Sequence, residues 1–74
     1  MDRELDGYKL WSGSEKMGVA AKWVGTITVT NRAGEAYVHA LDEAASDDPI
    51  AAANYADERL REVKAVGPDF EIEF

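Results

Sequence analysis

The stretch that most constrains this fold is a helix signal over residues 46–68, SDDPIAAANYADERLREVKAVGP. Asp48 is a suitable N-cap, because its carboxylate can accept a hydrogen bond from a backbone N–H that has no partner inside the helix. Pro49 follows at the first helical position, where a missing N–H costs nothing. Gly67 can adopt the left-handed conformation that closes a helix, and Pro68 cannot continue one. The sequence therefore predicts one long helix that ends at Gly67.

One side of this predicted helix is small and apolar. At about 100° per residue, five side chains fall within one arc of roughly a third of the circle: Ala52, Ala53, Ala56, Leu60 and Val63. Because three of these five are alanine, we expect the first two turns to lie close against a sheet. The far side is polar and is expected to face solvent, with an ion pair between Asp57 and Arg61: Asn54, Asp57, Glu58, Arg61 and Glu62.

The residues before the helix predict three strands. Residues 1–6 are charged and are expected to form a frayed tail. Residues 7–11, GYKLW, predict a short strand, and residues 12–18 have the Gly and Ser content of a loop. A long strand is predicted over residues 19–30, and a returning strand over residues 35–41.

The turn at residues 31–34 sets the register of this hairpin. A four-residue loop pairs Ile27 with Val38 and Val29 with Ala36, and Gly25 is a candidate bulge. A three-residue loop with a bulge at Gly34 would shift the pairing by one residue. That alternative register would put Tyr37 and His39 on the inner face.

The last six residues, DFEIEF, alternate between apolar and acidic side chains. This period of two predicts a strand with one buried face. The apolar set is Phe70, Ile72 and Phe74, and the acidic set is Asp69, Glu71 and Glu73. We expect deletion of residues 69–74 to unfold the protein.

Together these elements predict a single domain over residues 1–74 in the order β-β-β-α-β. The fold class is two-layer α+β, with an antiparallel sheet of about four strands and one helix on one face. A right-handed crossover from the helix would set the last strand beside the first or the third strand, and the first is preferred.

Composition limits the chemistry that this chain can perform. Its 74 residues are 46% hydrophobic and include no cysteine, which excludes disulfides, thiolate catalysis and Cys-based zinc sites. No run approaches membrane-spanning length, and the first residues lack the apolar core of a signal peptide, so a cytoplasmic location is the simplest interpretation.

The acidic charge is concentrated in the second half of the chain. Residues 1–40 hold five acids and five bases, whereas residues 41–74 hold ten acids and three bases. The second half therefore carries the whole net charge of −7. Such a surface repels nucleic acid and anionic membranes and favours basic partners. The alternative is that acidity only keeps a small domain soluble.

Few residues suggest catalysis. His39 is the only histidine, and a strand histidine bonded to water or to a neighbour explains it without a catalytic triad. Asp42, Glu43, Asp47 and Asp48 lack the spacing of a calcium loop, and acids before a helix are favourable for its dipole alone. We therefore expect no enzymatic activity, no cofactor and no metal. Four aromatic residues are candidates for a patch or for the core: Tyr8, Trp11, Trp23 and Tyr37.

Two resemblances bear on function. Residues 36–63, AYVHALDEAASDDPIAAANYADERLREV, are similar to the strand, loop and alanine-rich helix of HicB-like antitoxin domains, although the Pro-Gly-Cys loop of that family is missing. The whole chain, which is small, acidic and cysteine-free, looks like phage-encoded anti-CRISPR proteins. That second resemblance implies an inhibitor in the cytoplasm of a host cell, whose carboxylates occupy a basic groove meant for nucleic acid.

The expected function is a non-catalytic acidic inhibitor that blocks a basic, nucleic-acid-binding surface of a partner protein, such as a CRISPR–Cas effector. On a regular strand, alternate carboxylates recur at about 6.6 Å, a step comparable to the phosphate repeat of nucleic acid. The alternative is a HicB-like antitoxin or a small dimeric regulatory module that pairs through a strand edge, so the chain is expected to be a monomer or a homodimer. The predicted partner-binding residues are Asp69, Glu71, Glu73, Asp57, Glu58, Glu62, Tyr37 and His39.

Overall fold

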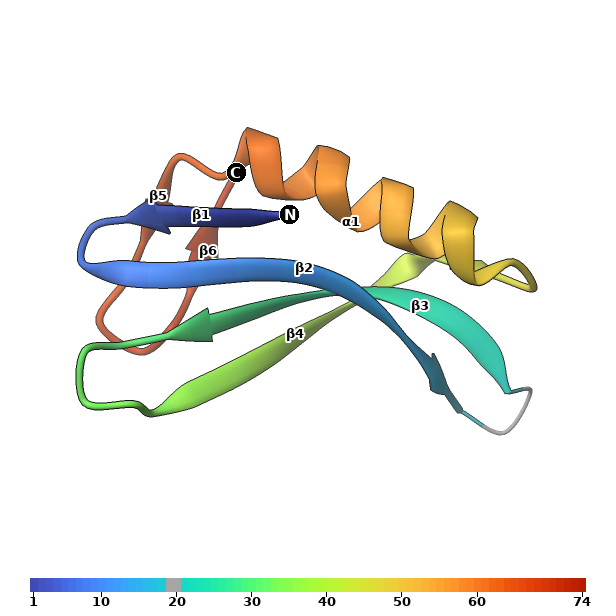
Figure 1. Cartoon of the computed structure of the whole chain (residues 1–74), viewed down its shortest axis with the longest axis horizontal. Helices are drawn as coiled ribbons and strands as arrows, with labels where there is room; N and C mark the ends of the chain where they lie inside the picture. Colours follow the sequence, from blue (N-terminus) through green and yellow to red (C-terminus); the bar gives the residue numbers. More distant parts are fainter. Residues whose placement is uncertain (19–20) are drawn as a thin grey trace.

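The computed structural model describes residues 1–18 and 21–74. Its elements in chain order are β1 Asp2–Leu5, β2 Tyr8–Met17, β3 Lys22–Thr30, β4 Ala36–Ser46, α1 Pro49–Glu62, β5 Ala65–Val66 and β6 Ile72–Glu73. The first four strands form one antiparallel sheet in the order β1-β2-β3-β4, and β5 pairs with β6 in a separate small sheet. Figure 1 shows α1 lying across one face of the large sheet, with the β5–β6 pair at one end. The predicted α+β fold class is confirmed.

The core lies between α1 and the inner face of the large sheet. Its buried cluster is Leu10, Ile27, Val29, Leu41, Ala56, Leu60, Val63 and Val66. The predicted alanine face is confirmed at Ala52 and Ala56, which are fully buried, whereas Ala53 is only half-buried. Gly25 allows the close approach, because a Cβ atom there would lie 2.7 Å from the main-chain oxygen of Ala52. Within the described residues, no helix is long and apolar enough to cross a membrane.

The N-terminal tail is ordered, and the prediction of a frayed end was wrong. Asp2–Leu5 pairs with β2 as an edge strand, with Leu5 opposite Tyr8. Asp6 and Gly7 join the two strands, both with positive φ (54° and 84°). Such a two-residue turn is the one that an Asp-Gly pair favours in hairpins, so this signal was present in the sequence and was missed.

The second strand also extends beyond its predicted end. Residues 12–17 belong to β2, although their Gly and Ser content suggested a loop. They pair with residues 22–27 of β3. The hydrogen bonds of this pairing hold them in a strand although their own strand propensity is low. The predicted start of the long strand, residues 19 and 20, lies outside the described residues.

The β3–β4 hairpin has the alternative register. The Asn31 N–H donates to the Glu35 carbonyl oxygen at 2.9 Å, and Gly34 has φ +87°. Ile27 therefore pairs with His39 rather than with Val38. Further along, the expected irregularity at Gly25 is present, because residues 42–45 of β4 stand opposite the single residue 24 of β3.

The helix begins where the sequence predicts and ends earlier. Asp48 is the N-cap, and its carboxylate accepts a hydrogen bond from the Ile50 N–H at 2.9 Å. The helix ends at Glu62, because Val63 adopts an extended backbone with ψ 125°. The prediction that Gly67 closes the helix was wrong: Gly67 instead begins the tight turn between β5 and β6.

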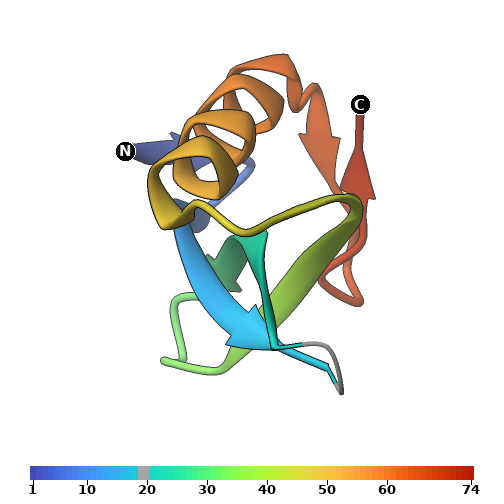
Figure 2. The ribbon, with the colours of Figure 1, turned by 90° about the vertical axis from the view of Figure 1, so that its right-hand side faces the viewer.

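The C-terminal residues form a hairpin of their own instead of joining the large sheet. The predicted strand of six residues is reduced to Ile72–Glu73, because Phe70 has φ +64° and lies in the turn. The last strand consequently does not lie beside the first one; the fourth strand of the large sheet is β1. The hairpin is anchored where the Asp6 carboxylate accepts a hydrogen bond from the Val66 N–H at 3.1 Å. Figure 2 shows this hairpin on the side of the view opposite to the N-terminus.

Candidate functional site

Three exposed carboxylates are carried by the C-terminal hairpin of residues 65–74, which we call the acidic hairpin. Asp69, Glu71 and Glu73 are all exposed, and this segment contains no lysine or arginine. Asp69 lies in the turn, so the carboxylates do not form the evenly spaced row that a continuous strand would give. Glu71 folds back toward Gly67, where its Cβ would lie 3.4 Å from a Cβ placed on that glycine. The surface is therefore a compact acidic knob.

The acidic hairpin meets β4 through Phe70. The Phe70 carbonyl oxygen lies 2.6 Å from His39 Nε2, and the Phe70 ring stands edge-on to Tyr8 with centroids 5.8 Å apart. Tyr37 lies beside His39, with ring centroids at 4.8 Å, and remains 55% exposed. The structure thus brings Tyr37 and His39, both predicted as partner-binding, to the border of the acidic hairpin.

On its other side the acidic hairpin contacts the end of α1. The Arg59 guanidinium carbon lies 3.9 Å from the centroid of the Phe74 ring, a favourable cation–π arrangement. Arg59 also pairs with Glu62 at 3.3 Å. Glu62 is therefore linked through Arg59 to the chain end beside Glu73, and Glu58 is exposed on the same helix.

Asp57 does not belong to this surface. Its carboxylate accepts a hydrogen bond from the Ser12 hydroxyl and lies 3.9 Å from the N-terminal ammonium group. The predicted ion pair with Arg61 is not among the described contacts. Asp57 instead ties α1 to β2 and to the start of the chain, which is a structural role.

Several cationic side chains of this protein are engaged in contacts within the chain itself. Arg3 Nη1 donates to the carbonyl oxygens of Leu60 and Val63, at 2.9 and 2.8 Å, at the C-terminal end of the helix. Lys22 pairs with Asp47, and Arg59 with Glu62. Among the described residues, no cation lies within ion-pair distance of Asp69, Glu71 or Glu73. The negative field of the acidic hairpin is consequently left unneutralised at the surface.

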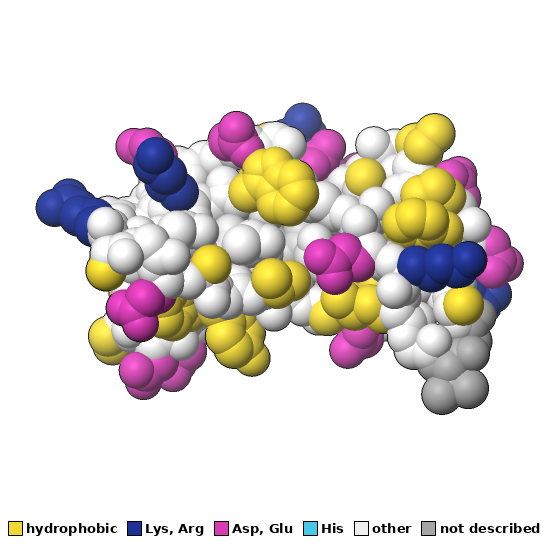
Figure 3. Space-filling view, turned by 60° about the horizontal axis from the view of Figure 1, so that its bottom comes forward, with side chains coloured by type: hydrophobic (Ala, Val, Ile, Leu, Met, Phe, Trp, Pro, Cys, Tyr) yellow, Lys and Arg dark blue, Asp and Glu magenta, His cyan; other side chains and the backbone are white. Residues whose placement is uncertain are grey.

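A second surface is the face of the large sheet that α1 does not cover. Trp11, Thr28 and Val38 form a row of paired residues across it, with Trp11 53% and Val38 44% exposed. The Trp11 ring lies over Gly13, where a Cβ atom would come within 3.0 Å of it. Figure 3 shows hydrophobic side chains standing among scattered charges on this face.

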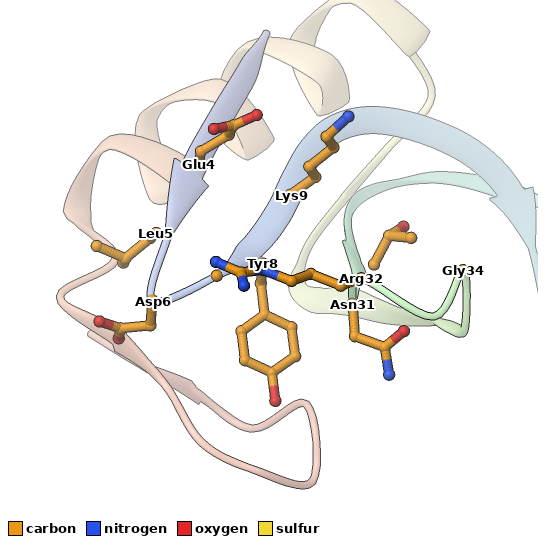
Figure 4. A pocket seen from close by; sticks show the side chains of 10 residues that line it. Glu4, Leu5, Asp6, Tyr8, Lys9, Asn31, Arg32 and Gly34 are labelled. Atoms are coloured by element: carbon orange, nitrogen blue, oxygen red, sulfur yellow. The ribbon is translucent and has the colours of Figure 1, made fainter.

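A shallow depression of about 680 Å³ lies between the Asp6–Gly7 turn and the β3–β4 turn. Figure 4 shows the Arg32 side chain reaching across it past the Tyr8 ring. Its wall carries two carboxylates, of Glu4 and Asp6, and two cations, of Lys9 and Arg32. These opposite charges balance, so the depression does not select a ligand of either sign.

The groups considered for chemistry lie apart. His39 does not line this depression, and within the described residues no three His, Asp or Glu side chains come together as metal ligands. Glu43 accepts a hydrogen bond from the Tyr55 hydroxyl at 2.8 Å. The pKa of Glu43 is lowered by a backbone hydrogen bond and then by Tyr55, and its carboxylate raises the pKa of Tyr55. This pair ties β4 to α1.

The sequence located the acids of the hairpin and missed the groups that hold the hairpin in place. Asp6 and Phe70 hold the acidic hairpin against the rest of the fold. Of these contacts, only the Asp-Gly turn signal at residues 6–7 was visible in the sequence, because it indicates that the N-terminal segment containing Asp6 is ordered. Comparisons of this chain with protein-family models, with curated proteins and with solved structures found no match.

Proposed function

We propose that this chain is a non-catalytic inhibitor that uses its acidic hairpin to dock on a basic, nucleic-acid-binding surface of another protein. The observation that carries the proposal is the charge of Asp69, Glu71 and Glu73, which are all exposed and form no ion pair among the described residues. Two cations lie nearby: Arg59 is engaged by Glu62 and Phe74, and the exposed Lys64 donates its main-chain N–H to the Glu73 carbonyl oxygen at 2.7 Å. A negative surface of this kind accelerates encounter with a basic partner and repels nucleic acid.

The neighbouring aromatic groups support the same use of this surface. Tyr37 is exposed at the border of the acidic hairpin, and tyrosine is enriched at the centres of protein interfaces because it combines apolar area with a hydroxyl group. The resemblance to anti-CRISPR proteins makes CRISPR–Cas effectors the first partner class to test. The knob shape means that binding would depend on local charge complementarity, without a phosphate-like repeat.

The test compares two variants of equal net charge. The hairpin variant is Asp69→Asn/Glu71→Gln/Glu73→Gln. The control variant is Asp2→Asn/Glu4→Gln/Glu15→Gln, which removes three exposed carboxylates from β1 and β2. Purified CRISPR–Cas effectors and other nucleic-acid-binding proteins are assayed for nucleic-acid binding with and without each chain.

We expect the wild type and the control variant to inhibit nucleic-acid binding by a susceptible protein, and the hairpin variant to lose inhibition. Inhibition should also weaken as salt is raised. Equal inhibition by both variants, or a partner that binds the chain and its nucleic acid together, would overturn the proposal.

A further inference from the structure

The outer edge of β4 over residues 36–40, which we call the β4 edge, is an unprotected strand edge. The sheet order leaves β1 and β4 as the two outermost strands. β1 is four residues long and carries three charged side chains in its sequence DREL, a common protection against edge-to-edge pairing. The β4 edge reads AYVHA and has no proline, lysine or acid.

The direction of its backbone groups follows from the ladder. Asn31 donates to Glu35 across the hairpin, and hydrogen-bonded residues alternate along an antiparallel strand. Tyr37 and His39 therefore direct their N–H and C=O groups toward β3. The groups that point outward belong to the exposed residues Ala36, Val38 and Ala40.

The pairing at the β1 end of the sheet also predicts that the backbone groups of Val38 point to the open edge. The Ser12 N–H donates to the Met1 carbonyl oxygen at 3.0 Å, so the backbone groups of Ser12 point toward β1 and those of Trp11 toward β3. Trp11 pairs with Thr28, and Thr28 pairs with Val38. The N–H and C=O groups of Thr28 thus point toward β2 and not toward β4. Its partner Val38 therefore directs its own N–H and C=O groups to the open edge.

The acidic hairpin does not occupy these groups. Its recorded hydrogen bond to β4 is the one between Phe70 and the His39 ring, on the face that α1 covers. Tyr37, 55% exposed, and Val38, 44% exposed, flank the edge on opposite faces of the sheet. Among the described contacts, the acidic hairpin therefore makes no hydrogen bond to the outward backbone groups of the β4 edge.

We propose that the β4 edge binds a second copy of this chain, in an antiparallel arrangement with the two-fold axis at Val38. Val38 then lies opposite Val38, and Ala36 opposite Ala40, and each of these pairs exchanges both N–H···O bonds. The two four-stranded sheets become one continuous sheet.

The side chains of this edge are compatible with a second copy, although each chain carries a net charge of −7. In the two-fold register Glu35 lies opposite Leu41, and Asp42 lies opposite Gly34, so no acid faces an acid. The edge itself offers no carboxylate to attract a basic strand, whereas the acidic hairpin does. The inference is independent of the proposed inhibitor function.

Two physical terms set the strength of this dimer. A single pair of short strands buries less than the roughly 1,200–2,000 Å² of a specific, stable interface, so association should be weak and concentration-dependent. Two chains of net charge −7 repel each other, and salt screens this repulsion. The dimer should therefore become tighter as ionic strength rises, the opposite of the salt dependence expected for binding a basic partner.

The test is sedimentation equilibrium of the full chain over a range of concentrations at low and at high salt, with Val38→Pro as the decisive variant. Proline at Val38 removes an N–H that the pairing of the described strands directs away from β3, as is tolerated on edge strands. We expect Val38→Pro to keep the wild-type circular dichroism spectrum and to remain monomeric. The wild type should associate, and more strongly at high salt.

A second pair of variants keeps the test decisive if Val38→Pro does not fold. Val38→Lys places two cations together at the two-fold axis, whereas Thr28→Lys adds the same charge one strand inward. We expect Val38→Lys to weaken self-association at least about tenfold, or about 1.4 kcal/mol, and Thr28→Lys to leave it unchanged. A wild type that stays monomeric at both salt concentrations, association that falls with salt, or equal effects of both lysines would overturn the proposal.

Discussion

A Cβ atom on Gly25 would lie 2.7 Å from the main-chain oxygen of Ala52 and 3.1 Å from the Cβ of Ala56. The closest approach of helix and sheet is thus made by a glycine on β3 and by the backbone of α1. No flexible side chain is present at this contact to move aside.

We therefore expect Gly25→Ala to push α1 away from the sheet and to lower the free energy of unfolding by about 1–3 kcal/mol, the usual cost of overpacking. Urea denaturation measures it. Gly13→Ala is the matched control, because the atoms nearest to its new methyl group belong to side chains, the end of the Trp11 ring at 3.0 Å and the Thr26 hydroxyl at 3.6 Å. A loss no larger for Gly25→Ala than for Gly13→Ala would contradict the expectation.

Arg3 closes the C-terminal end of the helix. Its Nη1 donates to Leu60 and Val63 at 2.9 and 2.8 Å, and a cation there also opposes the helix dipole. Replacement by methionine keeps the length of the side chain and leaves these carbonyl groups without their donor. We expect Arg3→Met to lower the free energy of unfolding by about 1–3 kcal/mol. Arg61→Met, at an exposed position of the same helix, should cost much less.

The hydrogen bond between Tyr55 and Glu43 makes stability depend on pH at both ends of the range. The pKa of Glu43 lies below its ordinary value of 4.5, so this stabilisation is present above about pH 4.5 and is lost as pH falls through the lowered pKa. The pKa of Tyr55 is raised above 10.0, so its stabilisation is present below pH 10 and is lost as pH rises through the raised pKa.

Tyr55→Phe should therefore be less stable than the wild type near neutral pH, and the difference should shrink at both extremes. Thermal unfolding between acid and alkaline pH measures this gap. An NMR titration of the Glu43 carboxyl should show its pKa rising in the variant, although not fully to 4.5, because the backbone hydrogen bond remains. An unchanged Glu43 pKa would show that the hydroxyl bond is not formed.

Of the three apolar residues in the C-terminal stretch DFEIEF, two are expected to contribute to stability, in addition to the buried Val66 of the same hairpin. Phe70 and Ile72 pack against the core cluster, whereas Phe74 is 38% exposed. Phe70→Ala/Ile72→Ala should lower the thermal midpoint strongly, because each side chain loses part of the 1.5–3 kcal/mol that full burial provides. Phe74→Ala should lower it little. Deletion of residues 69–74 should unfold the protein, and a truncated chain with the wild-type midpoint would contradict this.

Local signals in the sequence were reliable where they depended on neighbouring residues. Asp48 and Pro49 set the start of the helix, and the 3.6-residue period identified Ala52, Ala56 and Leu60 as buried. The Asp-Gly turn signal at residues 6–7 also depends on neighbouring residues. It was missed because the charged residues before it suggested a frayed tail. By contrast, the carbonyl groups at the early end of the helix are bonded by Arg3, which is far away in sequence.

The candidate binding surface was only partly accessible to sequence reasoning. The acids Asp69, Glu71 and Glu73 could be identified as a group, but the alternation that suggested an even row ended at Phe70, whose positive φ bends the chain. The placement of His39 beside Phe70 followed from a register that the turn residues left open between two choices. No periodicity could show that Asp57 is held by Ser12.

The sequence by itself determined the α+β class, the helix start, the alanine face and the excess of acid in the second half of the chain, because these depend on residue type and on short-range spacing. Only the tertiary structure decided where the helix SDDPIAAANYADERLREVKAVGP stops, and it stops at Glu62. It also decided that β1 is the fourth strand and that the C-terminus folds back as a separate hairpin. The reason is physical: the backbone groups of the strands and of the helix C-terminus are satisfied by partners distant in sequence, and the choice among such partners is made by the packing of the whole chain.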